Sequence, residues 1–388
     1  MNNAEQKLQA LLTITNAINS NVSVEELSTQ FEEVLVELNT LSEFALISCK
    51  PEWTIIKNHG VPAHELAFEL KKTLSIFPEP TRLVNAEHQH FYFDLVIPVF
   101  HKNMALAFLL IKGNMETAEI NFLQTLTNII AVAIENKRLV KNTISQEIAK
   151  HDLQIAAEIQ RYLVPEFFEK NNEIQAHGIY KPHSQIGGDY YDLIHSGEEY
   201  FICMADVSGK GVSAAILMAN FQAQLRTLIK YTNLPLDDLI IEINKRLNIS
   251  LNGEKFITLF IAKYNPKTRL LSYINAGHNP PILIEHQEGR LLKKGTIGLG
   301  MMAHLPFLTN MEVKVAPDTV LTCYTDGVIE QLNEQEEEFD LKRVEEIMLS
   351  HQHFHPSLIN AGILKAMEKH RGNKPYNDDI SLLSCRFV

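Results

Sequence analysis

The chain has 388 residues, more than one ordinary hydrophobic core holds, so we expect at least two domains. A hydrophobic content of 45% and a net charge of −12, without a basic cluster, indicate a globular protein and exclude the usual nucleic-acid binders. The four cysteines are far apart and form no C-x-x-C pair, which argues against a zinc site or a disulfide framework. The polar N-terminal sequence is unlike a signal peptide, and no apolar run is long enough to span a membrane. We therefore expect a cytoplasmic protein without membrane contact.

The first third of the chain alternates between helical and strand-like patterns. Apolar side chains follow helical spacing after Ser23, and Glu26 three positions later would complete a capping box. The period then shortens to that of strands. In chain order, we expect helices at 4–19 and 24–39, strands at 44–49 and 53–56, a helix near 62–74, a hairpin of 91–100 and 104–111, and a helix from 116 onward.

This order of elements resembles that of GAF-type sensor domains, over residues 1–135. The resemblance implies an α/β domain that senses a ligand or a partner. The residues themselves show no ligand chemistry, and we expect Trp53 to pack against the sheet. His88 and His90 share one face of a strand-like run, which leaves a metal half-site open. A solvated loop is favoured there because no third ligand is evident.

A long stretch without helix breakers follows. No glycine or proline occurs from Glu116 to Val164, a stretch of roughly 70 Å if it forms one helix. Within it lies a heptad-like seam that is apolar at both ends and polar in the middle. This pattern predicts a helical linker that forms a homodimer contact of modest stability. The seam positions are Ile130, Ile134, Lys137, Lys141, Ile144, Ile148, His151 and Ile155. The alternative is two helices with a break at 142–145, and Pro165 ends the element in either case.

Acidic residues recur beside strand-like runs in the rest of the chain. They are Asp189 and Asp192 after Gly187 and Gly188, Asp206 at the end of 200–206, Asp326 at the end of 320–326, and Asp378 with Asp379 before 380–388. An acid beside a buried strand is costly unless something pairs with it, and divalent cations held by carboxylate oxygens would account for every case. Each acid alone also has a structural interpretation, as part of a turn or as a helix cap.

Six segments of this half carry motifs in a fixed order. They are residues 153–165, 187–192, 205–211, 275–281, 324–330 and 377–380. Together they resemble the ordered motifs of the metal-dependent PPM serine/threonine phosphatases, in the branch of sporulation protein IIE and of stress-response phosphatases with an N-terminal sensor domain. The resemblance covers 152–388 and implies an α-β-β-α sandwich. We therefore expect an α+β chain with a GAF-like sensor domain at 1–135, a helical linker and regulatory helix at 136–165, and the phosphatase domain at 166–388.

The same resemblance implies that the acids bind two Mn²⁺ or Mg²⁺ ions. Asp189 would bridge the ions, Asp206 would bind one of them with the Val207 carbonyl beside it, and Asp326 and Asp378 would complete the ligands of the second. Carboxylate oxygens suit these ions, and two such ions can activate a water for attack on phosphorus.

Four further residues keep more than one interpretation. Asp192 and Asp379 are the second members of their acidic pairs, and Asp379 fits equally a residue that orients Asp378. A solvated side chain is favoured for Lys210 over a phosphate contact. For His278, a structural hydrogen bond is favoured over proton donation to the leaving serine oxygen.

The sequence thus predicts a metal-dependent phosphoserine/phosphothreonine protein phosphatase. The resemblance implies a phosphorylated regulatory protein, of the anti-sigma-factor-antagonist kind, as its substrate. The N-terminal domain would respond to a ligand or an activating protein and control activity through the linker. The alternatives are a catalytically inactive scaffold with a vestigial metal site and a hydrolase of small phosphoesters. Against the scaffold, every expected acidic position is filled.

Overall fold

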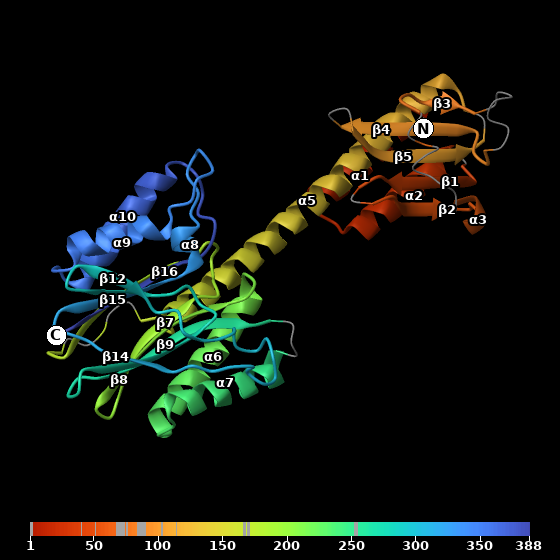
Figure 1. The fold of residues 1–388 in the computed structure, drawn as a ribbon. Helices are drawn as coiled ribbons and strands as arrows, with labels where there is room; N and C mark the ends of the chain where they lie inside the picture. The colour runs from red at the N-terminus through yellow and green to blue at the C-terminus, as the bar shows by residue number, and fades with distance from the viewer. Residues whose placement is uncertain are drawn as a thin grey trace. The chain divides into compact units, whose positions relative to one another are not determined.

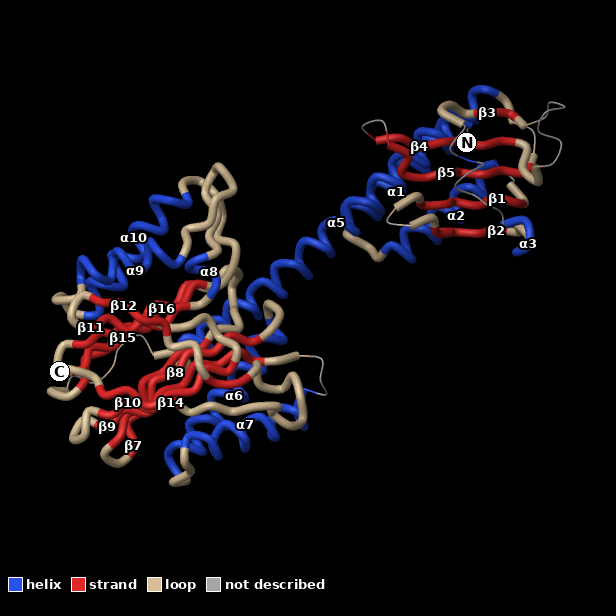
Figure 2. Tube along the Cα trace, in the orientation of Figure 1, coloured by secondary structure: helices blue, strands red, loops and turns tan. Residues whose placement is uncertain are grey.

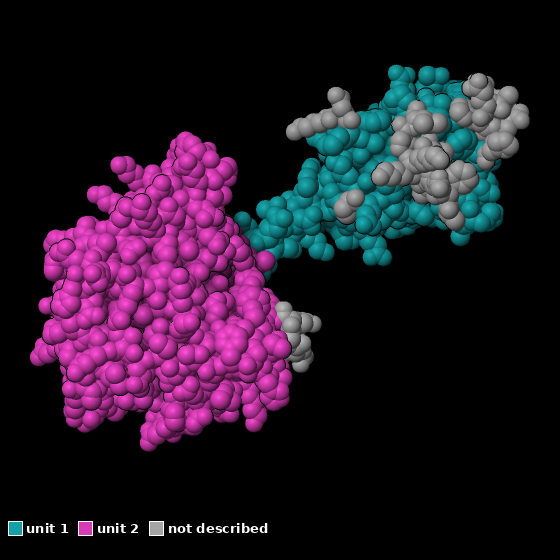
Figure 3. All heavy atoms as spheres, viewed as in Figure 1, with its two compact units in different colours: residues 1–148 teal, residues 149–388 magenta. Residues whose placement is uncertain are grey.

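The chain forms two compact units, residues 1–148 and 149–388 (Figure 3). The structure, a computed structural model, describes all residues except 1–2, 40, 51, 67–73, 75–76, 84–90, 102–103, 114, 166–167, 169–170 and 252–254. The boundary between the units falls inside one long helix, so each unit is described by itself. The three-part division into 1–135, 136–165 and 166–388 stays a prediction.

The first unit contains helices and strands in the predicted order, except that β3 was not expected and the strand expected from residue 91 begins at Leu95. They are α1 (Asn3–Asn19), α2 (Val24–Asn39), β1 (Glu43–Ser48), β2 (Thr54–His59), α3 (Ala63–Leu66), β3 (Thr81–Arg82), β4 (Leu95–His101), β5 (Met104–Lys112) and the first part of α5 (Thr117–Arg161). The Glu26 amide donates to Ser23 Oγ at 3.1 Å, which confirms the predicted start of α2. Residues 67–73 of the helix expected near 62–74 lie outside the described residues, and so do His88 and His90.

The strands of the first unit form one antiparallel sheet in the order β2-β1-β5-β4-β3 (Figure 1). Successive side chains of β1 point to opposite faces. Phe44 joins a core that α1, α2 and α5 cover, and Ala45 joins a second core on the other face. Trp53 stacks on Phe108 with ring centroids 5.6 Å apart, so it packs against the sheet as expected.

Helix α5 is continuous over 45 residues, from Thr117 to Arg161. The alternative of two helices with a break at 142–145 is therefore wrong, because nothing in this stretch interrupts the backbone hydrogen bonds. Among the described helices, α5 is the one long and apolar enough to cross a membrane by length and composition alone. Of its most apolar window, 44% is buried inside the protein, and core helices of soluble proteins pass the same test.

The second unit alternates strands with two pairs of helices. Its elements are β6 (Ile174–Lys181), β7 (Tyr190–Ser196), β8 (Glu199–Val207), α6 (Val212–Tyr231), α7 (Leu236–Leu251), β9 (Ile257–Asn265), β10 (Leu270–Ala276), β11 (Ile282–Glu285), β12 (Glu288–Leu291), β13 (Gly295–Thr296), β14 (Met311–Lys314), β15 (Thr319–Tyr324), α8 (Asp326–Ile329), α9 (Leu341–His351), α10 (Pro356–Arg371) and β16 (Ile380–Phe387).

These elements stack in four layers, α-β-β-α, as expected (Figure 2). The six-stranded sheet runs β13-β10-β9-β8-β7, with β14 on β10, and the five-stranded sheet runs β12-β11-β15-β16-β6. Helices α6 and α7 pack on the first sheet, and α9 and α10 pack on the second. The two sheets share one core, to which β16 contributes Leu383 and β8 contributes Met204. The neighbouring residue on β16, Leu382, belongs to a second core with residues of α9 and α10. Because successive side chains of a strand point to opposite faces, each sheet contributes to the core between the sheets and to the contact with its helices.

Candidate active site

Two of the predicted acids lie at one end of the six-stranded sheet. Asp206 is the penultimate residue of β8, and β7 begins one residue after Asp189. The antiparallel register pairs Tyr190 with Ala205, so it places Asp189 opposite Asp206. Sixteen residues of strand and turn separate the two aspartates in sequence, but the hairpin brings them together.

The remaining predicted acids lie at the end of two strands in the five-stranded sheet. Asp326 opens α8 just after β15, and Asp378 and Asp379 directly precede β16. The Thr325 amide donates to the Ser381 carbonyl at 3.2 Å, which extends the β15–β16 ladder to this point. The two sheets thus present their acids at the same end of the sandwich.

Hydrogen bonds from one sheet to the other fix Asp189. Its carboxylate oxygen Oδ2 accepts from Thr325 Oγ1 at 2.9 Å and from Ser381 Oγ at 2.7 Å. Only 2% of Asp189 is exposed. Both hydroxyls come from the five-stranded sheet, so the orientation of this aspartate depends on the packing of the sandwich.

Asp379 holds the glycine turn that precedes Asp189. Its oxygen Oδ2 accepts from the Gly188 amide at 2.8 Å, and Oδ1 accepts from the His183 amide at 2.7 Å. The approach is so close that a Cβ at Gly187 would lie 1.9 Å from Asp379 Oδ2. The Asp379 carboxylate therefore orients the backbone beside Asp189, whereas the sequence interpretation had this residue orient Asp378.

The last turns of helix α5 contact the same glycine turn. Gln160 is 5% exposed, and its Nε2 donates to the Gly187 carbonyl at 2.7 Å. The Gly187 amide donates back to Gln160 Oε1 at 3.2 Å. One side chain of the helix thus satisfies both backbone groups of a residue two positions from Asp189.

The carboxyl groups repel one another enough to retain protons. Burial, followed by the charges of Asp206 and Asp379, raises the pKa of Asp189 well above its usual value. Burial, followed by Asp326 and Asp378, raises the pKa of Asp206 to about 7. Burial and Asp378 also raise the pKa of Asp326. A cation among these groups would replace the protons and relieve the repulsion.

The donor set at this end of the sandwich fits Mg²⁺ or Mn²⁺, because it consists of carboxylate oxygens with a backbone carbonyl nearby. That carbonyl belongs to Val207, and a Cβ at Gly188 would lie 3.0 Å from its oxygen, so glycine leaves the approach open. Within the described ranges, no three His, Cys, Asp or Glu side chains already stand as a formed metal site. Lys210, which is 55% exposed, instead pairs with Asp378 at 2.7 Å. Lys210 thus has a partner in the cluster, which the favoured interpretation of a solvated lysine did not foresee.

Asp192 does not join the cluster. It is 1% exposed, and its Oδ2 accepts from Arg226 Nε and from the Tyr190 hydroxyl, both at 2.6 Å. Its Oδ1 accepts from the Leu193 amide at 2.9 Å. A buried ion pair within the sheet and α6 therefore accounts for this acid.

His278 lies behind the acids, in a buried hydrogen-bonded position. Its Nδ1 is 2.8 Å from Thr258 Oγ1, and its amide donates to Asn275 Oδ1 at 2.8 Å. Burial lowers the pKa of His278 to about 4, so the ring is neutral near pH 7. These contacts favour the structural role over that of a proton donor.

Three residues of the site were not foreseen from the sequence. Thr325 directly precedes Asp326 and Ser381 lies two positions after Asp379, so a hydroxyl at the end of a buried strand was the available signal. Gln160 lies in the motif of residues 153–165, but that motif did not indicate which of its side chains would contact the glycine turn.

Part of the second unit matches a family model, and two curated proteins are similar to the chain. The model of the stage II sporulation protein E (SpoIIE) family matches residues 196–388. Protein IcfG of Synechocystis sp. is 29% identical over 246 residues, which are 55% of this chain and 38% of that protein. Phosphoserine phosphatase RsbU of Bacillus subtilis is 27% identical over 190 residues, which are 48% of this chain and 56% of that protein. The chain thus spans about half the length of these relatives, or less.

A solved structure shares the fold of the second unit. The SiaA-PP2C domain of Pseudomonas aeruginosa aligns with a TM-score of 0.56 at 21% identity, over 63% of this chain and 99% of that domain. At this identity the likeness concerns the fold alone.

Proposed function

We propose that the second unit is a phosphatase domain of the stage II sporulation protein E family, whose model matches residues 196–388, and that the chain is a metal-dependent phosphoserine and phosphothreonine protein phosphatase. The observation that carries the proposal is the meeting of acids from both sheets at one end of the sandwich. Burying several carboxylates together is costly unless cations or other partners offset their charge. Clusters of this kind therefore occur mostly at functional sites.

The proposed ligands of Mn²⁺ or Mg²⁺ are Asp189, Asp206 with the Val207 carbonyl, Asp326 and Asp378. Divalent cations lower the pKa of water and offset negative charge on phosphoryl oxygens. The chain orients the ligands for this purpose. The hydroxyls of Thr325 and Ser381 fix Asp189, and Asp379 fixes the glycine turn that precedes it. Preorganised ligands need little rearrangement when the substrate binds.

We propose a phosphorylated regulatory protein, of the anti-sigma-factor-antagonist type, as the substrate. The similarity to a protein named phosphoserine phosphatase supports the phosphoserine chemistry. No arginine occurs in the motifs that contain the acids, so a phosphate would be recognised through the cations and the partner protein through its surface.

The first unit is proposed as a GAF-like sensor domain that controls the phosphatase in the cytoplasm. Its order of helices and strands supports the GAF-like assignment. A homodimer would form through α5, on which Ile144 and Ile148 of the predicted seam are 55% and 58% exposed. The N-terminal end of that seam does not take part, because Ile130 is buried in the core of the first unit. Apolar side chains on one helical face are the usual contact of paired helices.

The test compares phosphate release from a phosphoserine-bearing antagonist protein and from p-nitrophenyl phosphate, with and without Mn²⁺. The wild-type chain should require Mn²⁺ and should favour the protein substrate. Asp326→Asn should lose at least about a hundredfold in rate, because it removes a ligand charge. Asp238→Asn, which changes an exposed aspartate of α7, is the matched control and should keep the wild-type rate.

Two results would contradict the proposal. Equal or faster turnover of p-nitrophenyl phosphate would indicate a hydrolase of small phosphoesters. A rise in melting temperature with Mn²⁺ but no turnover of either substrate would indicate the scaffold.

A further inference from the structure

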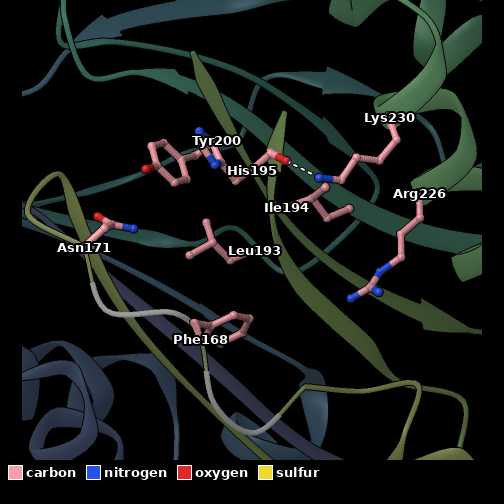
Figure 4. Close-up of a pocket in the computed structure, with 8 residues that line it drawn as sticks. All are labelled: Phe168, Asn171, Leu193, Ile194, His195, Tyr200, Arg226 and Lys230. Atoms are coloured by element: carbon pink, nitrogen blue, oxygen red, sulfur yellow. Dashed lines mark hydrogen bonds between the residues drawn. The ribbon is translucent and has the colours of Figure 1, made fainter. Parts of the chain in front are cut away.

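A cavity of about 490 Å³ lies at the outer edge of the six-stranded sheet (Figure 4). Strand β7 is the edge strand there. The cavity is lined by Phe168, Asn171, Leu193, Ile194, His195, Tyr200, Arg226 and Lys230. Residue 193 is four positions along the strand from Asp189, a distance of roughly 13 Å. Neither the proposed phosphatase chemistry nor the acidic cluster uses this cavity.

Two basic side chains from α6 reach the cavity from the same helical face. Arg226 and Lys230 are four positions apart, one helical turn. Arg226 uses Nε to bind the buried Asp192, and the terminal part of its guanidinium group points into the cavity (Figure 4). Lys230 Nζ donates to the His195 carbonyl at the cavity wall. Asp192 therefore fixes the guanidinium group in place, and Lys230 adds a positive charge.

An amide donor faces these cations from the other side. Asn171 Oδ1 accepts from the amides of Glu173 and Ile174, at 2.9 Å and 2.7 Å. These bonds hold its oxygen away from the cavity and turn its amino group, Nδ2, inward (Figure 4). None of the eight lining residues is acidic. The polar groups that face the cavity are thus mostly donors, the arrangement that recognises an anion.

The rest of the wall is apolar or aromatic. Phe168, Leu193 and Ile194 contribute apolar surface. The rings of His195 and Tyr200 stack with centroids 4.5 Å apart, and the Tyr200 hydroxyl donates to Glu173 at 2.7 Å, which fixes its ring. A cavity of this volume suits a small organic molecule rather than a single ion.

We propose that this cavity binds a small organic anion, with a carboxylate, sulfonate or phosphate group on an apolar or aromatic body. The acidic group would lie against Arg226, Lys230 and the Asn171 amide, and the body would lie against Leu193 and Tyr200. The site is independent of the proposed phosphatase activity, because it shares no residue with the acidic cluster.

The test uses the full chain in buffer without divalent cations, so that no cation at the acidic cluster attracts the probe. The probe is anilinonaphthalene sulfonate, whose fluorescence rises on binding, and its uncharged counterpart is phenylnaphthylamine. The sulfonate should show a saturable component that binds about fivefold tighter than the neutral compound.

Variants assign that component to the cavity. Asn171→Asp keeps the oxygen that accepts from the two amides but places a negative charge in the cavity, and it should weaken sulfonate binding about tenfold. Lys230→Gln, a change at an exposed side chain, should weaken it about threefold to fivefold. Lys342→Gln, a matched change on α9, should leave it unchanged. Neither cavity variant should affect the neutral compound.

The proposal fails if the neutral compound binds as tightly as the sulfonate, or if Lys230→Gln leaves sulfonate binding unchanged. A thermal melt checks that Asn171→Asp remains folded. If it does not, the Lys230→Gln result alone decides, because that side chain makes no buried contact that the fold requires.

Discussion

Replacement of Gln160 by leucine tests whether helix α5 supports the acidic cluster. The change removes the bonds to the Gly187 carbonyl and amide, at 2.7 Å and 3.2 Å, and leaves both groups buried. An unsatisfied buried donor or acceptor costs about 1–3 kcal/mol, and the apolar side chain recovers about 1 kcal/mol. For the two groups together, we therefore expect the free energy of unfolding of the second unit to fall by about 1–5 kcal/mol.

A local effect on cation binding should accompany this loss of stability. Gly187 precedes Gly188, whose amide is held by Asp379, and Asp189 follows directly. Residues that orient ligands typically change metal affinity about tenfold to a hundredfold when they are replaced. Under the proposed function, Gln160→Leu should shift the Mn²⁺ concentration that half-saturates the site upward by that factor.

The assay is urea denaturation of the full chain, followed by a Mn²⁺ titration of the melting temperature. Gln154→Leu, on the same helix but exposed, is the control and should change neither quantity. Gln160→Glu keeps the acceptor for the Gly187 amide but sets a second oxygen against the carbonyl, so it should also destabilise. A loss below about 0.5 kcal/mol in Gln160→Leu, with an unchanged Mn²⁺ midpoint, would refute the reasoning.

Three further predictions concern single side chains. Arg226→Met removes the cationic partner of the buried Asp192, which keeps its bonds from Tyr190 and Leu193. Because Arg226 is 45% exposed, the free energy of unfolding should fall by about 2–3 kcal/mol in urea denaturation, with Arg226→Lys recovering part of it. The pKa of His278 is 6.5 in the unfolded chain and about 4 in the folded protein. The neutral ring therefore contributes about 3 kcal/mol to the free energy of unfolding above pH 6.5, and this contribution is lost as the pH falls toward 4. In His278→Gln the decline of stability between these pH values should be shallower by that amount, whereas an unchanged profile would contradict the lowered pKa. Gly187→Ala places a methyl group 1.9 Å from Asp379 Oδ2. We expect the melting temperature of this variant to fall further below that of the wild type with Mn²⁺ than without it, and an equal difference under both conditions would contradict a local effect on the site.

The sequence by itself determined the local elements and the positions of the acids. The start of α2 follows from Ser23 and Glu26, because a cap acts within one turn. The 45-residue helix α5 follows from the absence of glycine and proline. The acids were recognisable because each stands where an apolar run meets a turn, a pattern that spans only a few residues. The α-β-β-α sandwich followed from motifs in a fixed order.

The tertiary structure decided which acids act together and what orients them. Asp189 and Asp192 are three positions apart in one strand-like run, and odd spacing turns their side chains to opposite faces. Which groups they then meet depends on the packing of distant segments: Asp192 meets Arg226 of α6, whereas Asp189 meets hydroxyls of the other sheet. The role of Gln160 has the same origin, since its partner Gly187 lies 27 residues away. Hydrogen bonds and charge repulsion act over a few ångströms in space, and only the packed sandwich brings these groups within that range.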